Sequence, residues 1–280
     1  MKSGIKKSGL IRIGNQTSFT AKSLILPFEY AVNNGFRAFE WFPDKKETGA
    51  GFTATEIDLK TRRYIRRTAR TNDIRLSIHA PWWANPMNYE GRALLLKDLK
   101  FAHDLGATLL NIHLYTGEGI NAYAMAISEI IEKTEEMGIK LSIENTTFTV
   151  PDDFNKLFTI LRNQKHRTIK HVGMCLDLGH ANLCDKTHND YLSFVDRLDK
   201  EVPIIHVHLH ENYGDEDSHL PVFTGPSGKD DAGLRNFIKR LKERNFSGAI
   251  ILEQWPDPPS LLNQARDKLQ SMFKAEDYWF

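Results

Sequence analysis

The chain has 280 residues, of which 41% are hydrophobic and 26% charged, and its formal net charge at pH 7 is +1. This composition is ordinary for a soluble globular protein, and the near-neutral charge gives no general field that favours nucleic acid or a membrane surface. Two cysteines exclude a disulfide framework. Because the basic N-terminus lacks the apolar stretch of a signal peptide and no window approaches the ~20 apolar residues of a membrane span, we expect a cytoplasmic protein without membrane contact.

Short apolar, β-rich runs alternate with longer amphipathic stretches along the chain. In chain order, the expected strands are Ile11–Ile13, Ala38–Trp41, Arg75–His79, Leu109–His113, Lys140–Glu144, Val172–Asp177, Ile204–His208 and Ala249–Glu253. A helical period is clearest in Ala93–Leu105, Ala122–Met137, Phe154–Leu161, Leu234–Arg244 and Leu261–Phe273. Gly106, Gly138 and Gly248 each stand just before a strand, where we expect them to end the preceding helix in a left-handed cap.

This alternation predicts an α/β fold built from parallel β-α units. Eight such units in about 250 residues match the size of a closed barrel. An open doubly wound sheet is the alternative, but no glycine-rich phosphate loop follows the first strand. Because no linker or change of composition interrupts the chain, we expect residues 1–280 to form one domain, a single (β/α)8 TIM barrel.

Six consecutive expected strands end in a residue that can bind a metal ion. These residues are His79, His113, Glu144, Asp177, His208 and Glu253. His180 follows one turn after Asp177, and Asp217 and His219 lie in the segment that follows the seventh strand. The C-terminal ends of the strands meet at one mouth of such a barrel. Because so many buried carboxylates and imidazoles are costly without a cation, the pattern predicts a divalent-metal site, with a mouth of water-bridged hydrogen bonds as the alternative.

Aromatic residues accompany these strand ends. Trp82 and Trp83 lie in the loop just after His79, where they are candidates to stack on a sugar ring or a base, or to pack their own loop. The segment Phe42–Phe52 follows the second strand and is either a lid or a solvated loop, of which we favour the loop. Of these residues, Trp82 and Trp83 are the candidate substrate contacts.

The seventh strand carries three alternating histidines, which face the same side of the strand. We expect His206 to lie deeper in the barrel, satisfied by hydrogen bonds, and His210 to contact the substrate or support the ligands. Cys175 lies inside an apolar strand and is expected in the core. Cys184 carries no signal that places it.

Taken together, these motifs resemble the xylose isomerase-like barrels, which include sugar isomerases and epimerases and the endonuclease IV class of abasic-site nucleases (AP endonuclease family 2). The resemblance spans about residue 10 to 265 and rests on HAP at His79–Pro81, IEN at Ile143–Asn145, CLDLGH at Cys175–His180, HLHEN at His208–Asn212, DSH at Asp217–His219 and LE at Leu252–Glu253. Each motif is short, but their order and their places at strand ends make the set specific to the superfamily, though not to one activity.

The resemblance implies two forms of metal site. The ligands that hold a single divalent ion in the sugar epimerases match Glu144, Asp177, His208 and Glu253. The neighbouring imidazole that contacts their substrate matches His180. The nucleases bind two further zinc ions, whose extra ligands match His79 and His113, with Glu144 bridging, and His180, Asp217 and His219.

The resemblance favours a divalent-metal-dependent sugar or sugar-phosphate isomerase or epimerase, with one Mn²⁺ or Mg²⁺ and a small carbohydrate-like substrate. Glu144 and Glu253 would then act as an acid/base pair on a metal-stabilised enediolate, and His180 would hydrogen-bond its oxyanion. The alternative is an endonuclease IV-like phosphodiesterase with two or three Zn²⁺ ions and DNA as partner, or another metal-dependent hydrolase or lyase. DLGHANL and HLHEN differ from the nuclease motifs, which argues against DNA cleavage. A binding or sensing protein is a third hypothesis.

Overall fold

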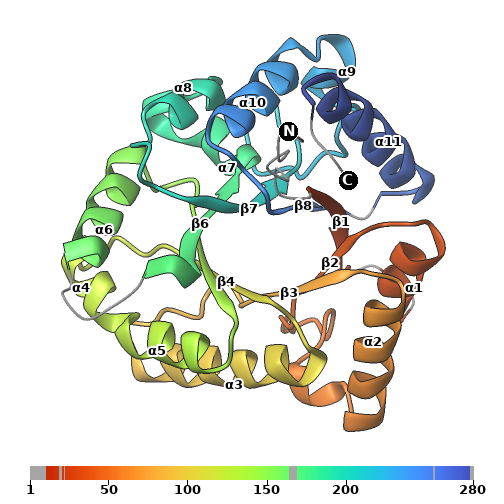
Figure 1. Ribbon diagram of the computed structural model, residues 1–280, viewed down its shortest axis with the longest axis vertical. Helices are drawn as coiled ribbons and strands as arrows, with labels where there is room; N and C mark the ends of the chain where they lie inside the picture. Colours follow the sequence, from red (N-terminus) through yellow and green to blue (C-terminus); the bar gives the residue numbers. More distant parts are fainter. Residues whose placement is uncertain (1–10, 19–20, 22, 164–168, 255, 278–280) are drawn as a thin grey trace, which may run out of the picture.

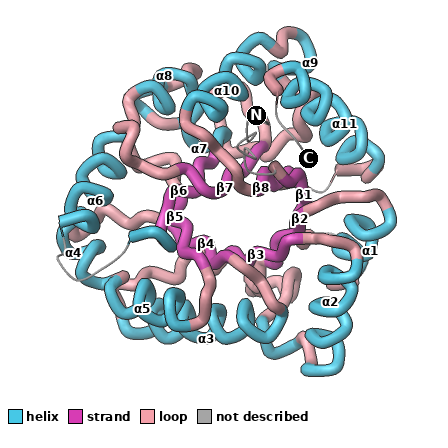
Figure 2. Tube along the Cα trace, viewed as in Figure 1, coloured by secondary structure: helices cyan, strands magenta, loops and turns pink. Residues whose placement is uncertain are grey.

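The computed structural model describes residues 11–18, 21, 23–163, 169–254 and 256–277. In these ranges eight parallel strands pair in chain order, and β8 pairs back with β1 to close a barrel. The strands are β1 (Arg12–Gln16), β2 (Ala38–Trp41), β3 (Arg75–His79), β4 (Leu109–His113), β5 (Lys140–Glu144), β6 (Val172–Asp177), β7 (Ile204–Leu209) and β8 (Ala249–Leu252). Figures 1 and 2 show the ring of strands at the centre with helices around it. The predicted (β/α)8 fold is therefore confirmed.

The helices cover the outside of the ring. They are α1 (Leu26–Asn33), α2 (Leu59–Thr71), α3 (Tyr89–Leu105), α4 (Ile120–Ala126), α5 (Ser128–Glu136), α6 (Pro151–Asn163), α7 (Leu178–Leu183), α8 (Tyr191–Asp196), α9 (Pro226–Lys229), α10 (Ala232–Glu243) and α11 (Ser260–Ala275). In α10 the buried residues are Leu234, Phe237, Ile238 and Leu241, the i, i+3, i+4, i+7 spacing of one helix face. Burying each such side chain contributes about 1.5–3 kcal/mol, so packing on the barrel holds these helices in place.

One stretch expected to form a single helix forms two helices, α4 and α5. The stretch Ala122–Met137 is divided at Ile127, which ends α4 and begins α5 with φ −79° and ψ −3°. The division has a packing cause, because α4 lies against α6 whereas α5 lies against β5. One straight helix cannot cover both neighbours.

The three glycines expected to end helices behave differently from one another. Gly106 ends α3 with φ +73°, and Gly138 follows α5 with φ +66°, so both adopt the predicted left-handed conformation. The prediction for Gly248 is wrong, because the positive φ after α10 belongs to Asn245. A Cβ on Gly248 would lie 2.1 Å from the carbonyl oxygen of Ile205, so glycine is needed there for the close approach of β8 to β7.

Both cysteines are free and buried in the interior. Cys175 lies in β6, as expected for a core residue. Cys184, which the sequence does not place, packs into the main hydrophobic cluster just after α7. No helix among the described residues is long and apolar enough to cross a membrane.

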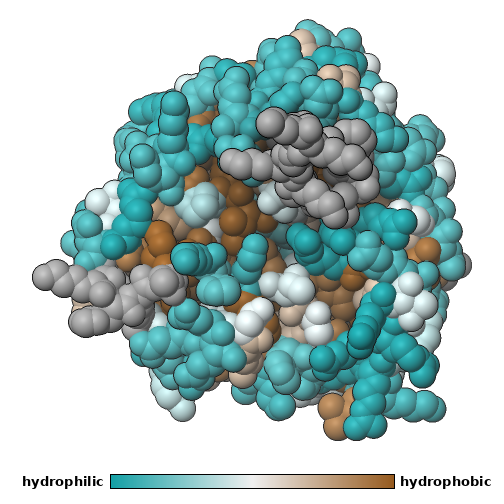
Figure 3. All heavy atoms as spheres, viewed as in Figure 1, coloured by the Kyte–Doolittle hydropathy of each residue, from teal (hydrophilic) through white to brown (hydrophobic). Residues whose placement is uncertain are grey.

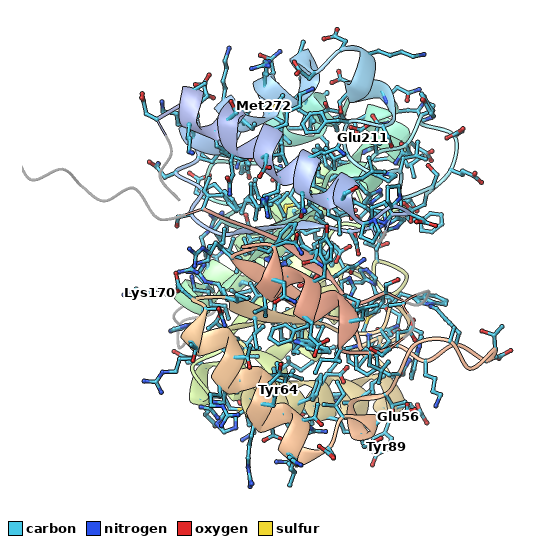
Figure 4. All side chains as sticks on the ribbon, turned by 90° about the vertical axis from the view of Figure 1, so that its right-hand side faces the viewer. Glu56, Tyr64, Tyr89, Lys170, Glu211 and Met272 are labelled. Atoms are coloured by element: carbon cyan, nitrogen blue, oxygen red, sulfur yellow. The ribbon has the colours of Figure 1, made fainter. Side chains whose placement is uncertain are left out.

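One end of the barrel is formed by the C-terminal ends of the strands, and the other by their N-terminal ends. In Figure 4, Glu56, Tyr89 and Glu211 follow β2, β3 and β7 and lie at one end, which we call the C-terminal mouth. Lys170 precedes β6 and lies at the other end, the N-terminal mouth. Figure 3 looks onto the N-terminal mouth, where hydrophilic residues surround apolar ones near the centre.

Candidate metal centre

The nine residues proposed as metal ligands lie together at the C-terminal mouth in three groups. The first group is His79, His113 and Glu144, the second is Glu144, Asp177, His208 and Glu253, and the third is His180, Asp217 and His219, which His210 joins. In each group the ligand atoms lie within 4.8 Å of one another. The structure thus brings all nine together, and Glu144 belongs to two groups.

Glu144 is fully buried at the end of β5 and is surrounded by imidazoles. Its Oε2 lies 3.0 Å from His79 Nε2 and 3.4 Å from His208 Nδ1, and its Oε1 lies 3.4 Å from His113 Nε2. The amide of Asn111 donates a hydrogen bond to Oε2, and the Ser142 hydroxyl donates to Asn111 at 2.7 Å. Both carboxylate oxygens therefore face ligand groups, as a carboxylate that bridges two cations requires.

Backbone carbonyls fix the orientation of three of the histidines. The Nδ1–H groups of His79, His180 and His219 donate to the carbonyl oxygens of Ala80, Asn145 and Glu253 at 2.6, 2.9 and 2.9 Å. A carbonyl only accepts hydrogen bonds, so the proton on Nδ1 is settled and Nε2 is the nitrogen that can bind a cation. Such partners are the usual supports of metal-binding imidazoles.

The turn from β6 into α7 positions Asp177. Its Oδ1 accepts the backbone N–H of His180 at 2.7 Å and so caps α7, while Asn145 pairs with the Asp177 backbone by two hydrogen bonds of 2.8 Å. His210, which is buried, places Nε2 3.2 Å from Asp177 Oδ1. A Cβ on Gly179 would lie 2.0 Å from the His210 ring, so the glycine of the DLGH motif makes room for this imidazole.

A closed loop after β7 carries the third group. Glu211 and Leu220 pair as an antiparallel bridge, with N–H to carbonyl distances of 2.9 and 2.8 Å. Within the loop His219 adopts φ +45°, which turns its ring toward Asp217, and Nε2 lies 3.2 Å from Asp217 Oδ2. His180 Nε2 approaches the same oxygen at 3.3 Å.

Burial and mutual attraction set the charges of these groups. Burial alone would raise the pKa of Glu144, but the nearby His208, His113 and His79 imidazoles outweigh it and hold that pKa well below its usual value. Burial would lower the pKa of His219, but the hydrogen bond to Asp217 outweighs it and raises the pKa to about 9. In the absence of a cation His219 therefore keeps a proton that a metal ion would have to displace.

Cys175 does not share this behaviour. Burial raises the pKa of its thiol well above the ordinary value, although His208 partly offsets the effect. A neutral thiol is a poor metal ligand. This result favours the core role expected from the sequence.

Glu40 was not identified from the sequence. It is fully buried in β2, where Oε1 lies 2.7 Å from His208 Nε2 and Oε2 lies 2.9 Å from His206 Nε2. This pairing leaves His208 Nδ1 to face Glu144 and Glu253, 3.4 Å from each. The only sequence signal is one carboxylate inside the short apolar run AFEW.

His206 lies deeper in the barrel than His208, as expected. The sequence also predicts that hydrogen bonds satisfy its ring, but only one of the two ring nitrogens has a partner among the described residues. Nε2 bonds to Glu40. Nδ1, although buried, has no hydrogen-bond partner in the part of the chain that the structure describes.

Substituting Glu40→Gln is expected to weaken binding of a divalent ion roughly 10- to 100-fold, the usual effect of removing a carboxylate that supports a ligand histidine. The measurement is competition with a chromophoric chelator. Asp44→Asn is the matched control, because Asp44 is buried at the same mouth and bonds Lys46 and Trp83 rather than a proposed ligand. Equal weakening in both variants would contradict a specific role for Glu40.

The candidate substrate contacts surround the mouth at different depths. Trp82 and Trp83 are 60% and 48% exposed, and the Trp83 indole donates to Asp44 at 3.3 Å. His210 is buried behind Asp177, so it supports that carboxylate more directly than it reaches the mouth. The segment Phe42–Phe52 is anchored at both ends, with the Phe42 ring 4.4 Å from the His79 ring and Phe52 buried in the core.

Comparisons with known proteins agree with this architecture. The family described as "Xylose isomerase-like TIM barrel" matches residues 28–275. The uncharacterized protein MJ1311 of Methanocaldococcus jannaschii is 27% identical over 215 residues, 69% of each chain. Among solved structures, a D-tagatose 3-epimerase-like protein has a TM-score of 0.71 at 22% identity, covering 94% of this chain and 97% of that one. The TTHB071 protein from Thermus thermophilus, soaked with ZnCl2, has a TM-score of 0.65 at 20% identity, covering 93% and 97%.

The structural likenesses establish the shared barrel, and the family match covers most of the chain, including every group of candidate ligands. The chain belongs to the family of xylose isomerase-like TIM barrels.

Proposed function

We propose that the protein is a divalent-metal-dependent isomerase or epimerase of a small carbohydrate-like substrate. The observation that carries the proposal is the convergence of Glu144, Asp177, His208 and Glu253, whose ligand atoms lie within 4.8 Å of one another at the C-terminal mouth. A site of three carboxylates and one imidazole suits Mn²⁺ or Mg²⁺, and one imidazole also tolerates Zn²⁺. The structural likeness to a D-tagatose 3-epimerase-like protein supports the same class of reaction.

Unpartnered atoms support the presence of a cation. Glu144 Oε1, His208 Nδ1 and Glu253 Oε2 are buried and have no hydrogen-bond partner among the described residues. Each such atom costs about 1–3 kcal/mol if nothing pairs with it. All three belong to the second group of ligands, so one divalent ion would satisfy them together.

The chemistry proposed is transfer of a proton next to a carbonyl. When bound, a divalent ion would supply the charge stabilisation that makes this weakly acidic C–H removable. Glu144 ends β5 and Glu253 directly follows β8, and these strands are separated in the ring. We propose that the two carboxylates hold and return the proton on two faces of the substrate. Burial lowers the pKa of His180, but Asp177 outweighs it and holds that pKa well above the usual value. This direction supports the proposal that the ring donates a hydrogen bond to an oxyanion.

The rim supports a carbohydrate-like substrate. Trp82 and Trp83 follow His79 of the first ligand group closely in the sequence and leave about half of their surface exposed. Indole rings offer an apolar face for a sugar ring together with a polar edge. The hydrogen bond from Trp83 to Asp44 fixes one of these rings in place.

A multi-zinc phosphodiesterase is the second candidate, favoured by the two additional ligand groups. Nine donors exceed the four that a zinc ion takes in a closed site. His79, His180 and His219 all present Nε2 toward these groups. In this form DNA with an abasic site would be the substrate, and two or three Zn²⁺ ions would be bound.

Metal content and two parallel assays test the proposal. We expect about one equivalent of Mn²⁺ or Mg²⁺ and incorporation of deuterium next to the carbonyl when a panel of ketoses is incubated in D2O. Two or three equivalents of Zn²⁺ together with cleavage of an abasic-site duplex would replace the isomerase with the phosphodiesterase. A metal-loaded protein inactive in both assays would reject both in favour of a binding or sensing role.

A further inference from the structure

A second cavity opens at the N-terminal mouth, at the opposite end of the barrel from the candidate metal centre. It has a volume of about 560 Å³. Its wall includes the first residues of β3, β4, β5, β7 and β8, together with Asn245, Ser247 and Gly248 from the turn that precedes β8. Figure 3 looks onto this end of the barrel, and Figure 4 shows Lys170 at this end and Glu211 at the C-terminal mouth.

The charged side chains that line this cavity are all cationic. They are Arg75, Lys140 and Arg244. Among the residues that the structure describes, no acidic side chain lines it. Asp73 acts on Arg75, and Asp196 and Asp199 act on Arg244, from outside the wall, so the surface of the cavity itself presents only positive charge, which attracts an anion.

Arg75 has no direct partner for its charge among the described residues. Within the described ranges its guanidinium has no hydrogen-bond or ion-pair partner, and Asp73 is paired with Arg12 at 3.0 Å instead. Burial lowers the pKa of Arg75, and the neighbouring Arg12 lowers it further. A half-buried guanidinium with five free donors is a strong binding group for an oxyanion.

Arg244 lines one side of the cavity, and hydrogen bonds hold its side chain in place. Its guanidinium donates to the carbonyl oxygens of Val195 and Asp199 at 3.1 Å each, and also to that of Leu198. These bonds hold the cation in one place before any ligand arrives. Pre-organisation of this kind lowers the entropic cost of binding.

The inner end of the cavity presents polar groups that can form hydrogen bonds. His206 lines it and is 1% exposed, with Nε2 bound to Glu40 and Nδ1 without a hydrogen-bond partner among the described residues. The hydroxyl-bearing residues Ser77, Thr108 and Ser247 also line the wall. Cations at the rim and hydrogen-bonding groups within form a set suited to a tetrahedral oxyanion.

We propose that the N-terminal mouth is a binding site for a small molecule that carries a phosphate group, held by Arg75 and Lys140 against the fixed guanidinium of Arg244. The volume of the cavity lies within the ~300–1,000 Å³ of typical small-molecule sites. The site is separate from the metal centre, so it stands whether or not the proposed isomerase activity does.

The experiment is titration of the full-length protein with inorganic phosphate at 150 mM NaCl, followed by calorimetry and by backbone amide NMR shifts. We expect phosphate to change the backbone amide chemical shifts of Thr108 and Ser247. We also expect phosphate to bind at least tenfold more weakly to Arg75→Gln and to Lys140→Gln than to the unmodified protein. A charge-assisted hydrogen bond is worth about 1.5–3 kcal/mol, which corresponds to roughly 10- to 100-fold. Because Arg75 bonds no group among the described residues, Arg75→Gln should fold with unchanged thermal stability in the absence of phosphate.

Two control variants remove the same charges from the same end. Arg37→Gln and Lys170→Gln each remove a positive charge that does not line the cavity. Phosphate binding should be unchanged in both variants. Equal weakening in the controls would reduce the effect to general charge attraction and overturn the proposal. Binding that persists in the Arg75→Gln, Lys140→Gln double variant, or shifts confined to the C-terminal mouth, would overturn it as well.

Discussion

Replacing Glu144 or Glu253 with glutamine is expected to reduce deuterium exchange into a ketose substrate by about 10²- to 10⁴-fold, the range that a positioned acid or base contributes. Glutamine keeps the shape of the side chain but cannot accept the proton. Both carboxylates are buried in the same ligand group, so neither can take over the role of the other. The measurement is the initial rate of exchange by NMR in D2O at saturating metal.

Both residues are also proposed ligands, so loss of metal must be separated from loss of the base. Asp177→Asn is the matched control, because Asp177 belongs to the same group but has no proposed role in proton transfer. Excess metal should restore exchange in Asp177→Asn, but not in Glu144→Gln or Glu253→Gln. If excess metal restored exchange in all three, the two glutamates would be ligands only, and the two-base mechanism would be wrong.

A bound divalent ion is expected to stabilise the folded protein strongly, and this stabilisation should increase as the pH rises. A ligand at about 1,000 times its dissociation constant stabilises the folded state by roughly 4 kcal/mol. The imidazoles must lose protons to bind a cation, so the affinity should rise by about tenfold per pH unit for each proton displaced. Thermal unfolding with and without chelator, between pH 6 and pH 9, measures the difference.

The metal-free protein should show the opposite trend over the same range. The pKa of His219 is raised to about 9 in the folded chain, since the bond to Asp217 outweighs burial. A raised imidazole pKa stabilises the folded state fully below the unfolded value of about 6.5, and this stability is lost as pH rises through 9. The lowered pKa of Asp217, where the His180 and His219 bonds outweigh burial, removes stability only at acid pH. A gap between loaded and chelated protein that stayed constant from pH 6 to pH 9 would contradict this account.

The barrel could be predicted because each strand carries its own local signal. A run such as Leu109–His113 is apolar, short and followed by a helical period, and these features do not depend on distant residues. The strand-end donors follow from the same reasoning, because parallel strands of one barrel end at one mouth. The division at Ile127 could not be predicted, since it depends on which neighbours α4 and α5 contact.

The parts of the site that were missed are contacts across the barrel. Glu40 in β2 meets His206 and His208 in β7, the first of them 166 positions away along the chain, and no local pattern indicates that meeting. The bond from Asn111 to Glu144 joins neighbouring strands whose relative register is set only by pairing in the sheet. Register and ring closure therefore determine what surrounds the donors.

The loop closed by Glu211 and Leu220 has a consequence for how this barrel can change over evolution. Asp217 and His219 enter the mouth on a segment whose ends are paired with each other, whereas the other donors lie on strands, directly after β8 or in the first turn of α7. Shortening or exchanging the residues between Glu211 and Leu220 would remove part of one ligand group without moving any strand of the barrel. Descendants of one barrel could thus acquire different numbers of bound ions through insertions and deletions in a surface segment, while the strand-borne donors were inherited intact.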